Sequence, residues 1–271
     1  MRAKLLAAAA LATAFGAGFW WLDTPPPPEP LPELLPLPPF PPRVAQGERY
    51  ERCLALLTDD APGALTLAET WLADGGGDGA THCRGLALIA DGRPELGVPL
   101  LERLAETSTA PDLARASILG QAARIRLMTG QADLAERDAT LALTLAPSDA
   151  DLLVTRATAE IALGQPPKAI DDLTKALALK PARPDALILR AAAWRRQNLL
   201  DRAKADIDRA IALDPDDPEA LLERGILRLH LGDRDGARAD WQQARAIDPN
   251  GTVADLAEQN LALLDAGPNQ R

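Results

Sequence analysis

Few side chains in this sequence could carry chemistry: two cysteines, two histidines, and arginines and aspartates that recur at one spacing. His82 and His230 are the only imidazoles, so a metal or catalytic centre built from several histidines is nearly excluded. The sequence has no GxSxG, HExxH or Walker motif, and residues 74–79 (DGGGDG) lack the strand-then-helix setting of a phosphate loop. We therefore predict that the protein is not an enzyme and uses no metal, cofactor or small-molecule substrate.

Cys53 and Cys83 are the only cysteines. In an oxidising compartment, an even pair favours a disulfide. Closing a loop of about 30 residues would contribute roughly 3 to 4 kcal/mol to stability. Buried free thiols, or metal or redox chemistry, are the alternatives. His82 is a poor companion ligand for Cys83, because adjacent residues on a helix diverge.

One arginine recurs in step with one aspartate. Arg156, Arg190 and Arg224 are each followed 16 residues later by an acid: Asp172, Asp206 and Asp240. The series could be a row of arginines awaiting acidic ligands, or three ion pairs within the fold. Because the acid keeps step with the arginine, we favour ion pairs. If exposed, each pair would contribute only up to about 1 kcal/mol.

Composition excludes one class of partner and favours helices. The net charge of −10 argues against nucleic acid, which calls for a basic face. The chain is 47% hydrophobic but only 3% aromatic, so its apolar residues are mostly Ala and Leu. Both enter helices at little entropic cost. A length of 271 residues allows one or two domains with a real core.

The N-terminal segment resembles a membrane span. Arg2 and Lys4 precede 18 uncharged residues (5–22), and Asp23 follows. As a helix this stretch would measure about 27 Å, which just reaches across a hydrocarbon core of roughly 30 Å. Positive charges before the span place the N-terminus in the cytoplasm and the rest of the chain outside.

Residues 1–23 could be a membrane anchor or a cleaved signal peptide. Phe19, Trp20 and Trp21 favour the anchor, because amphipathic rings settle at the membrane interface. The sequence Ala-Thr-Ala at 12–14 offers a small-x-small cleavage site for the alternative. We expect a single-pass inner-membrane protein whose main domain lies in the periplasm. The alternative is a soluble periplasmic protein released by cleavage.

A proline-rich segment follows at residues 24–45. Proline fills 11 of the 18 positions from Pro25 to Pro42. Each proline fixes φ and removes a backbone donor, so the segment cannot form a core element. We predict an extended, semi-rigid spacer of roughly 55 Å, at about 3.1 Å per residue. A proline-rich ligand for a partner domain is the less favoured alternative.

The rest of the chain repeats itself every 34 residues. The step is marked most clearly by four prolines, Pro147, Pro181, Pro215 and Pro249. Alanines hold the same register, and each unit is broken in its middle by Gly130, Gly164, Asn198 or Gly232. Such a unit is a helical hairpin with a left-handed turn residue. Because no hairpin can bury its faces alone, the units must stack into a solenoid.

This pattern resembles the tetratricopeptide repeat (TPR), whose 34-residue unit carries small residues at positions 8, 20 and 27 and proline at 32. It departs at position 4, which is Leu and not Trp, and at position 11, where Tyr is usual. The resemblance implies an all-α, right-handed TPR superhelix over residues 46–271. Its clear repeats are 116–149, 150–183, 184–217 and 218–251. Two degenerate repeats precede them at about 46–77 and 78–115, and a capping helix follows at 252–266.

In proteins resembling this family, the first helices line a concave groove that binds partners. Carried onto this chain, the groove positions select Arg124, Leu127, Met128, Val154, Thr158, Ile161, Ile188, Arg195, Arg196, Leu222, Ile226, Leu229 and His230. The set is mainly apolar with an arginine contribution, and it would suit a peptide with apolar anchors and some acids. The alternative is that several of these apolar residues only pack between helices.

We therefore expect a non-catalytic scaffold of the cell envelope that binds other proteins or peptide segments. An accessory or regulatory subunit of an envelope enzyme or secretion complex is the alternative. A fold alone does not name the partner.

Overall fold

The computed structural model describes residues 43–266, and every regular element within that range is an α-helix. The predicted membrane segment (1–23) and all but the end of the predicted spacer (24–45) lie outside the described residues. None of the helices in the described part is long and apolar enough to cross a bilayer.

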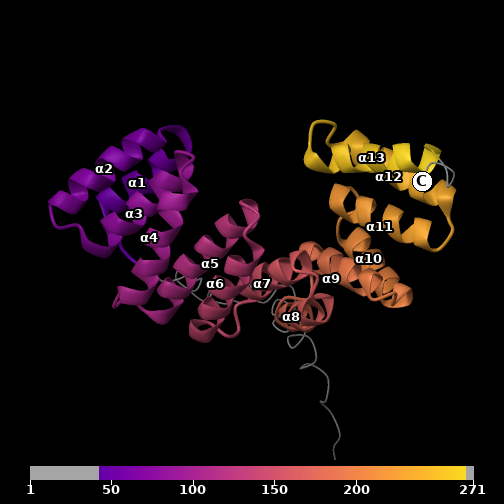
Figure 1. Cartoon of the computed structure of the whole chain (residues 1–271), viewed down its shortest axis with the longest axis horizontal. Helices are drawn as coiled ribbons and strands as arrows, with labels where there is room; N and C mark the ends of the chain where they lie inside the picture. Colours follow the sequence, from indigo (N-terminus) through magenta and orange to yellow (C-terminus); the bar gives the residue numbers. More distant parts are fainter. Residues whose placement is uncertain (1–42, 267–271) are drawn as a thin grey trace, which may run out of the picture. The chain divides into compact units, whose positions relative to one another are not determined.

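The helices pair into successive hairpins (Figure 1). The pairs are α1 (Glu48–Asp59) with α2 (Ala61–Ala73), α3 (Gly77–Ala90) with α4 (Pro94–Thr107), α5 (Asp112–Met128) with α6 (Ala132–Leu145), α7 (Ala150–Ala162) with α8 (Pro166–Leu179), α9 (Pro184–Arg196) with α10 (Leu200–Leu213), and α11 (Pro218–His230) with α12 (Arg234–Ile247). A single helix, α13 (Thr252–Ala266), ends the described chain.

The turn inside each clear hairpin depends on a residue with positive φ. Gly130, Gly164 and Gly232 have φ values of 74°, 72° and 86°, and Asn198 takes the same place in α9–α10 with φ 58°. This left-handed conformation is favourable for glycine and tolerated by asparagine. The turn predicted from the repeat is therefore confirmed.

Small residues let the paired helices approach closely, and a few large ones fill the remaining space. A Cβ added to Gly225 on α11 would lie 2.4 Å from Trp241 Nε1 on α12, so this contact requires glycine. Trp241 is 1% exposed, and its indole N–H donates to the Leu222 carbonyl oxygen over 3.2 Å. Ile207 on α10 is also fully buried. Ile207 and Trp241 are thus the large side chains that fill the space beside their hairpins' small residues.

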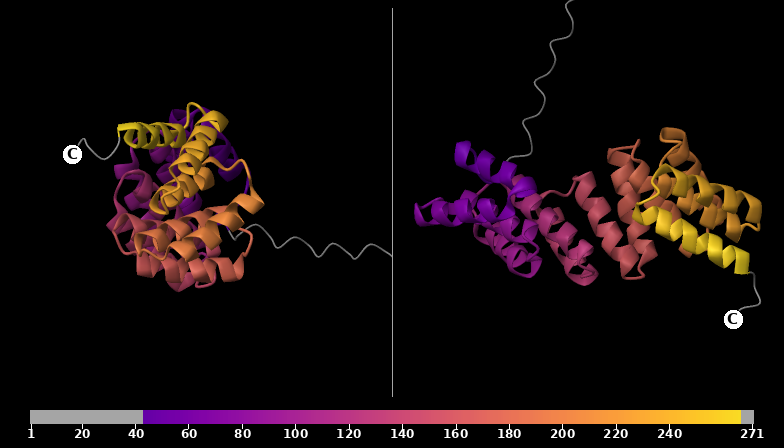
Figure 2. Two further views of the ribbon diagram at one scale, coloured as in Figure 1. Left: turned by 90° about the vertical axis from the view of Figure 1, so that its right-hand side faces the viewer. Right: turned by 90° about the horizontal axis from the view of Figure 1, so that it is seen from above.

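The hairpins stack in chain order, as the two further views show (Figure 2). One hydrophobic cluster runs from α4 to α11, and a second joins α11, α12 and α13. First helices of neighbouring hairpins also touch directly, as α5 does α7 and α9 does α11. Because elements on the inner side of a stack lie closest together, we take the first helices as its inner face. The predicted all-α solenoid is confirmed.

Helix α13 closes the last hairpin by packing on α11 and α12. Its buried face carries Ala257, Leu261 and Leu264. Its outer face is only partly polar, because Leu263 is 72% exposed and Leu256 is 48% exposed. These two leucines are seven residues apart and so fall on one side of the helix.

Candidate functional site

The predicted groove residues lie on α5, α7, α9 and α11, but they differ in how much of each side chain is accessible. Four are exposed: Arg124, Met128, Arg196 and His230. Seven are half-buried: Leu127, Thr158, Ile161, Arg195, Leu222, Ile226 and Leu229. Two are buried: Val154 and Ile188. The accessible part of the predicted groove is therefore smaller than the sequence implied.

Val154 and Ile188 have to be reassigned from the groove to the core. Each is only 8% exposed and belongs to the hydrophobic cluster that runs along the stack. The two residues occupy the same repeat position on α7 and α9. For these two residues the packing alternative describes the structure.

Most of the remaining apolar positions are also partly used in packing. Ile161 lies against the main hydrophobic cluster, and Leu222, Ile226 and Leu229 lie against the cluster around Trp241. Met128 differs from all of them, because 81% of its surface is exposed at the end of α5. It is the most exposed large apolar side chain in residues 43–266.

The three groove arginines also differ in whether they have a hydrogen-bond partner within the fold. Arg195 on α9 makes two hydrogen bonds to Glu223 on α11, at 2.6 and 3.0 Å, and so ties two repeats together. Arg196 donates to the carbonyl oxygen of Ile161 over 2.8 Å, in the last turn of α7. Arg124 is exposed and makes no ion pair with a residue in the described range. Of the three, Arg124 is the arginine left for an acidic partner.

The repeated arginine and aspartate form the ion pairs predicted from their spacing. Each arginine makes two nearly parallel hydrogen bonds to both oxygens of its acid: 2.6 and 2.9 Å for Arg156–Asp172, 2.7 and 2.7 Å for Arg190–Asp206, and 3.0 and 2.7 Å for Arg224–Asp240. The three aspartates are buried. These pairs link the two helices of a hairpin, and they are not a row of open ligand sites.

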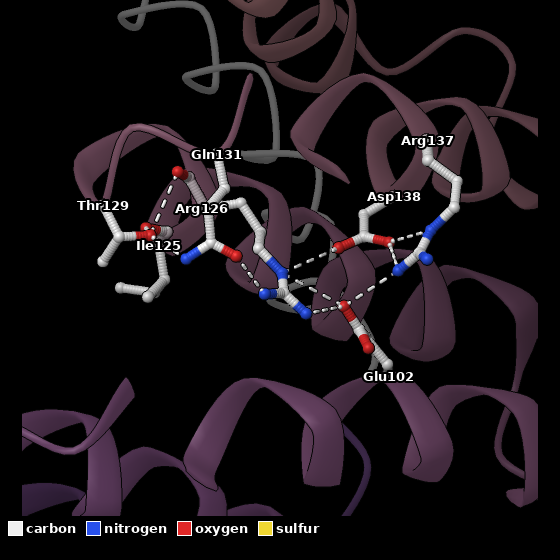
Figure 3. Close-up of polar contacts among 7 residues, drawn as sticks. All are labelled: Glu102, Ile125, Arg126, Thr129, Gln131, Arg137 and Asp138. Carbon is white, nitrogen blue, oxygen red and sulfur yellow. Dashed lines mark hydrogen bonds and ion pairs between the residues drawn. The ribbon is translucent and has the colours of Figure 1, made fainter. Parts of the chain in front are cut away.

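In the first clear repeat, the aspartate at the corresponding position has different ion-pair partners (Figure 3). Asp138 stands where the later repeats have their paired aspartates, but Ala122 replaces the arginine. Arg137 Nη2 lies 2.9 Å from Asp138 Oδ1, and Arg126 Nε lies 4.0 Å from Oδ2. Arg126 and Arg137 also contact Glu102 on α4, at 2.8 and 3.1 Å. The network therefore fastens α4 to the first clear repeat.

The carboxyl of Asp138 has an altered affinity for protons. Burial disfavours its charged form and raises its pKa to about 6, while the hydrogen bond from Arg137 opposes the shift. The carboxylate of Glu102 raises it further. The 34-residue register identified the position of Asp138, but no sequence pattern indicated that Glu102, 36 residues earlier, would reach it.

A second polar chain links the N-terminal hairpins, and sequence reasoning missed it. His82 on α3 is 3% exposed, with Nδ1 2.7 Å from the Tyr50 hydroxyl on α1 and Nε2 2.8 Å from Gln121 Oε1 on α5. Burial lowers the pKa of His82, and it raises that of Tyr50 to about 12. The only signal in the sequence was a lone histidine beside a cysteine.

The two cysteines meet beside this chain. A disulfide joins Cys53 on α1 to Cys83 on α3, with 6.1 Å between their Cα atoms. With Ala68 of α2, they form a small hydrophobic cluster of their own. Within residues 43–266, no three His, Cys, Asp or Glu side chains are arranged to hold a metal ion.

The repeats are also recognised by sequence comparison. Family models described as tetratricopeptide repeat match residues 154–203 and 189–262. Residues 154–262 contain tetratricopeptide repeats. The matches cover the later clear repeats, where the TPR register is strongest. No curated protein sequence matches the chain significantly.

Solved TPR structures share the fold at low sequence identity. PilF of Pseudomonas aeruginosa is similar with a TM-score of 0.62 and 16% identity, over 79% of this chain and 95% of PilF. A thermophilic TPR protein of Thermus thermophilus, TTC0263, is similar with a TM-score of 0.55 and 23% identity. The match covers 69% of this chain and 98% of TTC0263. A chain of the APC/C Cut9–Hcn1 hetero-tetramer is similar with a TM-score of 0.61 and 16% identity over 79% of this chain. The match spans only 42% of that last chain.

Proposed function

We propose that this protein is a non-catalytic scaffold that binds a partner protein or peptide through the inner face of its repeats. One observation carries the proposal: on a TPR stack, the inner face presents the exposed Met128 and the unpaired Arg124 four residues apart on α5. Residues four apart on a helix lie on the same side. We call Arg124, Leu127 and Met128 the α5 patch.

The chemistry of the α5 patch defines the kind of segment it would bind. Met128 is unbranched and polarisable, so it adapts to apolar side chains of different shape. Arg124 offers a fork of donors that suits a carboxylate. A helical or extended segment with an apolar anchor next to an acidic residue would meet both requirements. Arg196 and His230 add two exposed polar side chains further along the stack.

We further propose that the scaffold works at the cell envelope, tethered to the inner membrane with its repeats in the periplasm. The uncharged stretch at 5–22 behind Arg2 and Lys4 supports export. The Cys53–Cys83 disulfide supports an oxidising compartment. A soluble periplasmic form, released by cleavage, is the alternative, and the mass of the mature N-terminus distinguishes the two.

The test compares two matched double variants of the full-length chain in cross-linking pull-downs from membranes. Arg124→Glu with Met128→Asp alters the α5 patch. Leu141→Asp with Lys204→Glu is the control. It also replaces one apolar and one basic side chain by acids, but at exposed sites on the second helices α6 and α10. We expect the first variant to lose its partner at least tenfold and the second to retain it, both with wild-type circular dichroism.

Equal capture by both variants would contradict the assignment to the inner face. A partner that co-purifies in fixed stoichiometry and dissociates from the α5-patch variant would favour the role of accessory subunit in an envelope complex. Several partners captured more weakly through the same patch would favour the scaffold.

A further inference from the structure

One position on the first helix differs in charge between otherwise similar repeats. The residues at this position, 34 apart, are Arg126, Glu160, Trp194 and Arg228. Each precedes the buried aspartate of its hairpin by 12 residues. The repeats therefore allow an internal comparison of what this place in the fold accepts.

Two of the four repeats have a guanidinium group at this place. Arg228 Nη1 lies 2.8 Å from Asp240 Oδ2, and Arg126 contacts both Glu102 and Asp138 (Figure 3). In the third repeat the residue is Trp194, and the Arg202 guanidinium stacks on its ring at 4.7 Å from the centroid. A planar cation from this position thus lies beside the buried aspartate in the first and fourth clear repeats.

The second clear repeat has a carboxyl group there. Glu160 is only 4% exposed, and its Oε2 is buried without a hydrogen-bond partner among the described residues. A buried carboxylate without a donor is costly, because it has lost its water and gained nothing in exchange. Neighbouring Asp172 adds like charge, which makes the ionised state still less favourable.

The cations near Glu160 are committed to other acids. Arg156 on the same helix donates two hydrogen bonds to Asp172 and one of 3.5 Å to Thr140. Lys175 on α8 lies 3.4 Å from Asp172 as well. Lys168 on α8 pairs with Glu136 on α6 over 3.2 Å. No described cation is therefore left over to neutralise Glu160.

A cavity of about 300 Å³ opens beside this carboxyl group, between α6, α7 and α8. The pairs just described form most of its lining, and Thr140 on α6 and Asp171 on α8 complete it. Its charged groups are four carboxyls and three cations, so one acid is in excess. Thr140, Lys168, Asp171 and Lys175 are exposed, which places the opening on the second-helix side and away from the α5 patch.

We propose that this cavity binds a guanidinium group, supplied as an arginine side chain of a partner protein, with Glu160 as its counter-ion. The bound group would take the place that Arg126 and Arg228 fill in the first and fourth clear repeats. Guanidinium suits the site because its planar fork of donors matches the geometry of a carboxylate. The site lies on a different face from the α5 patch, so it does not depend on the proposed function of that patch.

The protonation of Glu160 gives the proposal a distinctive signature. Burial and the Asp172 carboxylate raise the pKa of Glu160 to about 7, with Glu136 adding to the shift and Arg156 and Lys168 opposing it. A cation binds only the ionised form, so the affinity should rise as Glu160 loses its proton. Between pH 6 and pH 8 the ionised fraction, and hence the affinity, should increase about tenfold.

The test is calorimetric or NMR titration of the full-length chain in detergent micelles. The probes are the capped tripeptide acetyl-Gly-Arg-Gly-amide, the same peptide with Lys, and free L-arginine. We expect saturable binding of the arginine peptide that tightens about tenfold from pH 6 to pH 8, and weaker binding of the lysine peptide. Binding of free arginine alone would overturn the assignment to a partner's side chain.

Two variants and one control complete the experiment. Glu160→Gln should weaken binding at least tenfold and abolish its pH dependence. Glu160→Arg should remove binding while raising the midpoint of thermal unfolding, because it supplies the cation within the chain. Glu258→Gln, at an exposed site on α13, should change neither quantity. Undiminished binding to folded Glu160→Gln, or no binding to the wild type, would overturn the proposal.

Discussion

Arg190 on α9 donates two hydrogen bonds of 2.7 Å each to Asp206 on α10, and so links the two helices of the third clear hairpin. Asp206 is 5% exposed and has no second cation within hydrogen-bonding distance in the described structure. The equivalent Asp240 contacts Arg224 and, in addition, Arg228 at 2.8 Å. The same acid in the same fold thus has one cation in one repeat and two in the next.

This difference predicts unequal costs for the same substitution. Arg190→Ala should lower the free energy of unfolding by about 3 to 5 kcal/mol, because it leaves a buried carboxylate unpaired. Arg224→Ala should cost clearly less, since Arg228 still neutralises Asp240. Urea denaturation followed by circular dichroism measures both. Equal losses would show that the second arginine contributes nothing to Asp240.

The Tyr50–His82 hydrogen bond should have a measurable coupling energy. Tyr50→Phe removes the hydroxyl and leaves His82 Nδ1 without its partner, which should cost about 1 to 3 kcal/mol. His82→Leu should cost a similar amount, and the double variant should cost less than the sum. A double-mutant cycle in urea should give a coupling of about 0.5 to 3 kcal/mol. Strict additivity would contradict the contact.

Loss of the disulfide should weaken the N-terminal hairpins selectively. Cys53→Ala with Cys83→Ala should lower stability by about 3 to 4 kcal/mol, because an open loop gains entropy in the unfolded state. Hydrogen exchange should quicken in α1–α3 and stay unchanged in α11–α13. In the wild-type protein, thiol alkylation without reductant should label neither cysteine. Two labelled cysteines would rule out the bond.

Stability should fall as pH rises through the range in which Glu160 ionises. The folded-state pKa of Glu160 is about 7, above its ordinary value of 4.5, so the folded protein binds more protons between these values. The contribution from Glu160 is fully present below about pH 4.5 and is lost as pH rises through 7. We expect a loss of about 2 to 3 kcal/mol across the window.

Glu160→Gln should remove that part of the pH dependence, because glutamine does not titrate. Asp138→Asn should instead flatten the curve at lower pH, since the pKa of Asp138 is about 6. Urea midpoints recorded at half-unit steps from about pH 4.5 to pH 8 separate the two. A Glu160→Gln curve parallel to the wild type over this range would contradict the raised pKa.

Repetition made much of the fold predictable. A 34-residue step identifies the hairpin, and the step of Asp172, Asp206 and Asp240 with their arginines identifies the ion pairs without any structure. The turn at Asn198 also follows, because its register equals that of three glycines. These features depend on contacts within one repeat, which the sequence displays four times.

Contacts between repeats were not predictable in the same way. Val154 and Ile188 are buried in the cluster that runs along the stack, and Arg195 is held by Glu223 of the next repeat. The sequence places Val154 and Ile188 at one repeat position, but it does not show how much of their surface is covered, because that depends on how neighbouring hairpins meet. Position 11, which Glu160 occupies in the second clear repeat, was marked only as a departure from the TPR pattern. Its burial and its missing partner become visible once α6, α7 and α8 are packed together.

The disulfide of the first hairpins also determines how the chain would transmit force. A load entering from the N-terminal side reaches Cys53 in α1 and passes through the covalent bond to Cys83 in α3. Helix α2, enclosed in that loop, carries none of it. Fully extended, the 30-residue loop would measure roughly 100 Å, at about 3.3 to 3.6 Å per residue. The intact disulfide prevents this length of chain from being pulled out. The redox state of one bond would therefore determine how far this part of the chain can extend under tension.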